Sequence, residues 1–243
     1  MFKIAPEGHP FVVGFALLSL GMAVTARVCG GAWGGAAALA TLALVALAGF
    51  MFYFFRDPER NTPDRPDAFV SPADGRIIVV QPVVEERYFH EPRLQISIFM
   101  SPANVHVNRA PCAGTVVSSR HNTGKHFAAY REGASIRNEN NELVLETAHG
   151  RILVRQVAGF LARRTVCRVG PGAALRRGER FGIIKFSSRV DLYLPADSAA
   201  QVGIGDRVRA GETILAVVGD GASATRVCGR NDAVRDTEDA EEK

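Results

Sequence analysis

The chain has 243 residues, a hydrophobic content of 47% and a formal net charge of +4. This length suits one sizeable domain, or one domain with an appendage. The four cysteines are far apart and form neither a CxxC pair nor a Cys/His ligand spacing, which predicts reduced thiols and no metal site. Nucleic acid is disfavoured as a partner, because the sequence has no recognised binding motif and no interleaving of aromatic and basic residues.

Two uncharged, apolar segments lie near the start of the chain. Phe11–Ala26 is the shorter, and after Arg27 and a glycine-rich break the second covers Ala36–Phe55. The second segment would be about 30 Å long as a helix, which matches a bilayer core. We therefore predict a membrane-associating hydrophobic hairpin over residues 1–55. A buried hairpin in a soluble core is the alternative, although these segments lack the polar face of an amphipathic core helix. A cleaved signal peptide fits poorly, because a longer apolar segment follows at once.

The flanks of the hairpin indicate its orientation. Aromatic residues at 52–55 precede Arg56 and Arg60, an order typical of the cytoplasmic membrane interface. The loop between the apolar segments holds only Arg27. We therefore expect the protein in the cell membrane, with the domain that follows the hairpin on the cytoplasmic side; a re-entrant or interfacial hairpin stays open. The acidic tail makes the middle of the chain more basic than the total, which favours an anionic membrane as partner.

The rest of the chain is predicted to be β-rich. Residues 56–68 form a proline-rich, charged linker, residues 69–219 a β domain, and residues 220–243 a disordered tail. Residues 202–216 carry glycine turns between short strands, similar to the barrel-sandwich hybrid of biotinyl and lipoyl carriers but without their lysine tip. The fold class is therefore mainly β, a barrel-sandwich-hybrid-like domain behind a helical hairpin. Alternating or apolar runs predict these strands: 76–84, 94–100, 115–118, 142–147, 152–157, 165–169 and a single strand over Phe181–Pro195.

Three polar sites could carry chemistry. Asp74 lies in the turn Ser71–Gly75, His106 follows a strand and a Ser-Pro turn, and Ser187-Ser188 interrupt an apolar strand. Each has an ordinary structural explanation, but an Asp, a His and a Ser together are the parts of a serine-activating triad. The chain has no GxSxG elbow, which disfavours an ordinary hydrolase. A self-processing serine fits better: the Ser188 hydroxyl would attack the carbonyl of residue 187, and elimination and hydrolysis would leave a pyruvoyl group.

The sequence resembles the phosphatidylserine decarboxylase proenzymes of the short bacterial and archaeal type. The resemblance covers about residues 45–220 and depends on the order and combination of its motifs. The matching segments are Phe55–Pro58, Ser71–Gly75, Phe99–Pro111, Val157–Val169, Arg176–Pro195 and Val202–Ala216.

The resemblance implies a pyruvoyl-dependent decarboxylation of phosphatidylserine to phosphatidylethanolamine and CO₂. Ser188 would become the pyruvoyl group, whose carbonyl forms a Schiff base with the substrate amine and withdraws electrons. Cleavage between Ser187 and Ser188 would give a heterodimer of a β chain (1–187) and an α chain (188–243), with a higher oligomer left open. Asp74 and His106 match the aspartate and histidine of the family motifs.

Two positions depart from the family pattern. Ser187 stands where glycine is usual, and a side chain there is expected to slow cleavage. Arg109 stands where longer members carry a second histidine, so His106 would serve both steps, or His121 or His126 would supply the second role. The arginines available to meet phosphate or carboxylate are Arg56, Arg60, Arg163, Arg164, Arg176 and Arg177. Three alternatives stay open: a non-enzymatic adaptor or unprocessed pseudoenzyme, a decarboxylase of a related lipid headgroup, and a decarboxylase of a soluble amino acid.

Overall fold

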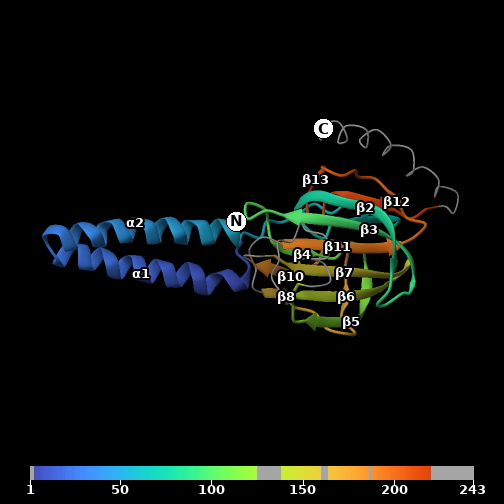
Figure 1. Cartoon of the computed structure of the whole chain (residues 1–243), viewed down its shortest axis with the longest axis horizontal. Helices are drawn as coiled ribbons and strands as arrows, with labels where there is room; N and C mark the ends of the chain where they lie inside the picture. The colour runs from blue at the N-terminus through green and yellow to red at the C-terminus, as the bar shows by residue number, and fades with distance from the viewer. Residues whose placement is uncertain (1–2, 125–137, 160–163, 186–187, 220–243) are drawn as a thin grey trace, which may run out of the picture.

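The computed structural model describes residues 3–124, 138–159, 164–185 and 188–219. A long helical hairpin projects from one end of a mainly β domain (Figure 1). The expected combination of apolar hairpin and mainly β domain is therefore confirmed. The predicted tail, residues 220–243, and His126 lie outside the described residues.

The hairpin begins with a short 3₁₀ turn, η1 (Pro6–Gly8), followed by α1 (His9–Val28) and α2 (Gly31–Phe54). Both helices are longer than the apolar segments that predicted them. Gly31 ends the break between them with φ of +62°, a conformation that favours glycine. Both helices are long and apolar enough to cross a membrane, and most of their side chains face outward. An exposed apolar surface of this extent indicates contact with lipid or with another protein.

Among the described residues, the antiparallel strands of the β domain form three sheets. The largest sheet has eight strands in the order β13-β2-β3-β11-β7-β6-β5-β9, and two three-stranded sheets have the orders β4-β10-β8 and β1-β14-β12. The strands are β1 (Ala68–Val70), β2 (Gly75–Glu85), β3 (Glu91–Met100), β4 (Val107–Arg109), β5 (Gly114–Asn122), β6 (Asn140–Thr147), β7 (Gly150–Ala158), β8 (Arg164–Cys167), β9 (Ala174–Leu175), β10 (Arg180–Lys185), β11 (Ser188–Pro195), β12 (Ala199–Ala200), β13 (Arg207–Val208) and β14 (Ile214–Val217).

Alternation along the central strands builds the core. Val190 and Leu192 of β11 lie opposite Ile98 and Ile96 of β3, and all four are fully buried. The intervening positions carry polar side chains such as Asp191, which are buried on the other face of the sheet. This period of two is the pattern from which the strands were predicted, because successive side chains of a strand point to opposite faces.

The segment Phe181–Pro195 is not one strand, and this prediction is wrong. β10 ends at Lys185 and pairs with β4 and β8, whereas β11 begins at Ser188 and pairs with β3 and β7. Apolar residues flank the break on both sides, so the hydrophobic pattern continues across it. The chain therefore passes from one sheet to another between Lys185 and Ser188.

The foot of the hairpin packs on the β domain through an apolar cluster that we call the apolar base. Its buried members are Ala5, Met51, Phe54, Phe55, Val105, Val107 and Ile183. They come from the chain before α1, the end of α2, and the region of β4 and β10. The apolar base therefore fixes the hairpin at the end of the β domain where β4 and β10 lie (Figure 1).

Candidate functional site

Several strands of the large sheet begin or end next to the hairpin. Ser188 starts β11 and lies between Met100, the last residue of β3, and Ala158, the last residue of β7. Arg76 lies opposite Phe99 on the other side of β3, which brings the start of β2 to the same end. The chain segments of Ser188 and Asp74 are therefore separated by one strand, and their backbones by roughly 10 Å.

Ser188 is fully buried. Its hydroxyl donates a hydrogen bond of 3.3 Å to the thioether sulfur of Met100. The amide of Asn108 approaches the same sulfur at 3.9 Å. A thioether is a weak acceptor and takes up no proton at neutral pH. Ser188 thus has an apolar, weakly bonded environment and needs a base from elsewhere to become a nucleophile.

His106 is fully buried at the apolar base, where its ring lies against Phe54 with 4.2 Å between centroids. Its Nδ1 donates to the carbonyl oxygen of Asn104 at 3.0 Å, since a carbonyl can only accept. Nε2 is buried and has no hydrogen-bond partner among the described residues. Burial lowers the pKa of His106 to about 4, the bond to Asn104 opposes this, and Arg56 adds a small lowering. The imidazole is therefore neutral at pH 7, with an unshared electron pair on Nε2.

Asp74 has two partners, neither of which is His106. Arg60 donates to its Oδ2 and the backbone amide of Ala210 to its Oδ1, both at 2.7 Å. Asp74 and Arg60 are largely buried, so the pair ties the segment after the hairpin to the loop before β2. Gly75, the first residue of β2, has no room for a side chain, because a Cβ there would lie 2.1 Å from the carbonyl oxygen of Phe99.

The three predicted site residues gather at the hairpin end of the domain but are not directly bonded. The backbone carbonyl of His106 accepts from the amide of Ile184, four residues before Ser188. None of the hydrogen bonds among the described residues joins Asp74, His106 and Ser188 to one another. The triad therefore stays a prediction, as does the cleavage bond, whose other residue, Ser187, lies outside the described residues.

Arg109 has a role that the sequence did not reveal. Its guanidinium donates to the carboxylate of Asp57 at 3.2 Å and to the carbonyls of Pro58 and Gly178. Arg180 contacts the other oxygen of Asp57 at 2.6 Å. We call Asp57, Arg109 and Arg180 the ionic clamp. The nearest signal in the sequence was the Arg-Asp pair directly after the aromatic cluster, but no spacing connects it with Arg109.

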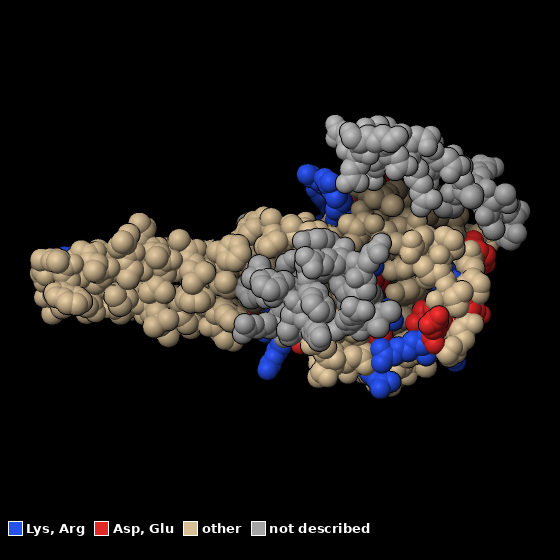
Figure 2. All heavy atoms as spheres, viewed as in Figure 1, with Lys and Arg blue, Asp and Glu red and all other residues tan. Residues whose placement is uncertain are grey.

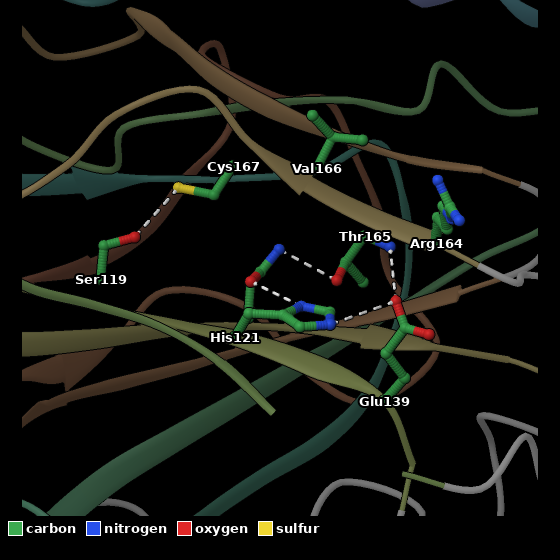
Figure 3. A pocket seen from close by; sticks show the side chains of 8 residues that line it. Ser119, His121, Glu139, Arg164, Thr165, Val166 and Cys167 are labelled. Carbon is green, nitrogen blue, oxygen red and sulfur yellow. Dashed lines mark hydrogen bonds and ion pairs between the residues drawn. The ribbon is translucent and has the colours of Figure 1, made fainter. Parts of the chain in front are cut away.

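His121, a candidate for the second catalytic histidine, lies in a separate pocket of 640 Å³ (Figure 3). Its Nδ1 lies 3.1 Å from Asn141 Oδ1, and its Nε2 lies 3.9 Å from a carboxylate oxygen of Glu139. The backbone of Glu139 accepts from Ala158, the neighbour of Ser188. Two strands, β7 and β6, separate β5, which carries His121, from β11, which begins at Ser188. The polar groups of the His121 pocket bond with one another.

The structure also describes three of the four cysteines. Cys29, Cys112 and Cys167 are unpaired, and burial raises the pKa of the Cys112 thiol to about 12. Within the described ranges, no group of three or more His, Cys, Asp or Glu side chains could hold a metal ion.

The family model described as phosphatidylserine decarboxylase matches residues 47–216, from the end of α2 to β14. The chain belongs to the phosphatidylserine decarboxylase family. Curated relatives named phosphatidylserine decarboxylase proenzyme agree. The relative from Desulfotalea psychrophila is 46% identical over 213 residues, covering 87% of this chain and 95% of the relative. The relative from Pelobacter propionicus is 47% identical over 218 residues, covering 89% of this chain and 97% of the relative.

The family match includes the hairpin foot as well as the β domain. Its first residues belong to α2, which provides Phe54 of the apolar base, and its range includes Asp57 and Arg109 of the ionic clamp. Most of the residues that hold the hairpin on the domain therefore lie within the matched range. The word proenzyme in the names of the relatives implies that a precursor is processed.

Proposed function

We propose that the protein is a membrane-associated phosphatidylserine decarboxylase that forms phosphatidylethanolamine and CO₂ with a pyruvoyl group made from Ser188. The observation that carries the proposal is the buried Ser188 at the start of β11, four residues after Ile184, whose amide donates to the carbonyl of His106. Family membership supports phosphatidylserine as the substrate and the release of CO₂ as the reaction. The pyruvoyl group and self-cleavage are our own additions.

The residues at the site suit self-cleavage. The Ser188 hydroxyl would add to the carbonyl carbon of Ser187, so that the peptide C–N bond breaks and an ester forms. His106 would take the hydroxyl proton at Nε2 and return it to the departing nitrogen of Ser188. Its neutral state and its orphaned, buried Nε2 support this role. Loss of the α-proton of residue 188 with elimination of the Ser187 carboxylate would leave dehydroalanine. Its imine tautomer would add water and lose ammonia, which leaves the pyruvoyl group.

The sheet register supports a stable complex of the two cleaved chains. β11 would begin the α chain at Ser188, and it lies between β3 and β7 of the β chain. Its pairing with β3 runs from Ser188 to Pro195, opposite Met100 to Arg93. Cleavage before Ser188 would therefore leave the new terminus within the sheet, held by strand pairing and by the core side chains of β11.

The chain would assist decarboxylation by binding and by excluding water. A pyruvoyl group supplies an electron sink that accepts the electron pair left when CO₂ departs. Burial of position 188 limits the access of bulk water to the reacting carbon. The neutral His106 could hold or return a proton beside the substrate.

The hairpin supports a membrane location. Its exposed apolar surface suits a bilayer, and His106, directly before β4, lies against Phe54 at its foot. The hairpin projects from one end of the β domain (Figure 1). A diacyl substrate stays in the bilayer, so this arrangement would bring the site to the headgroup. The aromatic cluster followed by Arg56 favours a domain on the cytoplasmic side.

Intact-mass spectrometry of wild type and Ser188→Ala tests the proposal. Wild type should give two chains, residues 1–187 and a blocked chain from 188, and should convert phosphatidylserine in vesicles. Ser188→Ala should stay uncleaved and inactive, because alanine has no hydroxyl to attack or eliminate. Ser119→Ala, which removes a serine hydroxyl near Cys167, should behave like wild type.

Two results would refute the proposal. One is normal cleavage of Ser188→Ala, and the other is a single full-length wild-type chain under conditions that allow activity. The second result would favour the adaptor or pseudoenzyme alternative. Assays of phosphatidylserine, a related serine-headgroup lipid and free serine in parallel separate the proposed substrate from the remaining alternatives.

A further inference from the structure

Two arginines lie directly opposite each other at the edge of the large sheet. Arg207 of β13 is the register partner of Arg76 of β2, and both side chains are exposed. Like charges in this position destabilise a strand pair. Neither guanidinium forms a hydrogen bond or ion pair with any residue in the described ranges 3–124, 138–159, 164–185 and 188–219. The arrangement therefore has an electrostatic cost that an anion between the two side chains would remove.

The two arginines line a pocket of 830 Å³, which we call the arginine pocket. Arg209 lines it too, and Figure 2 shows basic side chains gathered over the β13 end of the domain. Asp74 is the acidic side chain in the lining, but Arg60 and the Ala210 amide occupy its oxygens. The pocket thus offers guanidinium groups without a competing free carboxylate.

Neutral groups complete the lining. Asn104 accepts from the amide and the hydroxyl of Ser101 through its Oδ1, at 2.9 and 2.8 Å. Its amide nitrogen has no partner among the described residues and can donate to a ligand. Guanidinium forks with a neutral amide donor suit phosphate oxygens, which only accept hydrogen bonds.

The arginine pocket is near both the reacting residue and the membrane-facing end. Phe99 lines the pocket and precedes Met100, the partner of Ser188. Ala103 lines it as well, and its carbonyl accepts from Arg56 at 2.7 Å and from Tyr53 at 3.2 Å. A ligand in the pocket would therefore lie beside the foot of the hairpin and within one strand of Ser188.

We infer that the arginine pocket binds the phosphodiester of the lipid headgroup, with Arg76 and Arg207 as the principal donors. This inference rests on the proposed function and deepens it, because it assigns the residues that hold the substrate. A phosphodiester anion between the two guanidinium groups offsets their repulsion. The serine part of the headgroup, joined to that phosphate, then extends towards the end of β3 and Ser188.

The test compares Arg76→Gln/Arg207→Gln with wild type and with two further variants. Arg76→Lys/Arg207→Lys keeps the charge but loses the planar fork. Arg151→Gln removes an exposed arginine at the opposite end of β7, where it pairs with Glu146. In mixed micelles of phosphatidylserine, we expect the Gln double variant to raise KM roughly tenfold or more, with a much smaller fall in kcat. The Lys variant should lie in between, and Arg151→Gln should match wild type.

A binding measurement makes the inference independent of turnover. All variants are also made with Ser188→Ala, and the binding of glycerophosphoserine and of inorganic phosphate is measured by calorimetry. We expect roughly tenfold weaker binding of glycerophosphoserine when both arginines are replaced by Gln. Tighter binding of inorganic phosphate than of the diester would overturn the lipid assignment.

The two proposals fail in different ways. If wild type is active and all variants have the same KM, the inference about the arginine pocket is wrong, whereas the proposed function is unaffected. A wild type without turnover refutes the proposed function. Calorimetry then shows whether the arginine pocket binds an anion. Weaker binding after loss of both arginines supports the pocket as an anion site, and unchanged binding overturns it.

Discussion

Two contact regions of opposite chemistry join the hairpin to the β domain. The apolar base covers His106 with Phe54, whereas the ionic clamp holds Arg109, three residues further along, against Asp57. Burial acts on both basic side chains. It lowers the pKa of His106 to about 4, leaving a neutral base. It also lowers the pKa of Arg109, but Asp57 opposes this and an arginine stays charged.

The difference shows how environment assigns roles to neighbouring residues. A neutral imidazole with an orphaned nitrogen can take up a proton, whereas a guanidinium with three acceptors can only hold structure. Arg109 is thereby occupied in fixing the segment after α2. His106 is the candidate for both proton-transfer steps on this side of Ser188.

The largest effect is expected from His106→Gln. Glutamine keeps hydrogen-bonding capacity but cannot accept a proton at neutral pH, so self-cleavage should slow by roughly 100-fold or more. Time-resolved intact mass of freshly made chain measures the rate. His149→Gln is the control, because His149 is a more exposed histidine that bonds the carbonyl of Pro66. Equal cleavage rates in wild type and His106→Gln would remove His106 from the mechanism.

Much of the fold was predictable, because it follows from local patterns. β2, β3, β6 and β7 were expected from alternating or apolar runs, and the turns at Gly205 and Gly211 have the positive φ that glycine favours. The hairpin followed from composition alone. These features depend on neighbours in the chain, so the sequence shows them directly.

The contacts of the site were not predictable, because they join distant segments. The bond between Arg109 and Asp57 spans 52 residues, and Arg60 reaches Asp74 from the predicted linker. The motif around His106 was recognisable, but the aromatic ring that buries it comes from α2. The break between β10 and β11 was hidden because apolar residues occupy both flanks.

The second largest effect is expected from Asp57→Ala in the ionic clamp. Its carboxylate and Arg109 are almost fully buried, so this change leaves buried positive charge without its partner. We expect a loss of about 3–5 kcal/mol in the free energy of unfolding. The melting temperature in detergent should fall by roughly 10 °C. Glu146→Gln is the control at the exposed pair with Arg151 and should change the melting temperature little. A similar fall in both variants would contradict the distinction between buried and exposed ion pairs.

The smallest effect is a pH dependence that separates the neutral histidine from the charged clamp. His106 has a pKa of about 4 in the folded protein, below its usual 6.5, so the unfolded chain binds more protons between these values. The contribution of His106 to the free energy of unfolding is therefore complete above pH 7. It decreases by about 3 kcal/mol as the pH falls towards 4. Urea unfolding of uncleaved Ser188→Ala, with and without His106→Gln, isolates the contribution as the difference between the two curves. The carboxylates are the same in both proteins, so their contributions cancel in this difference. The contribution of the ionic clamp cancels too, because its arginines keep their charge. Parallel curves over this range would mean that His106 is not held neutral by the apolar base.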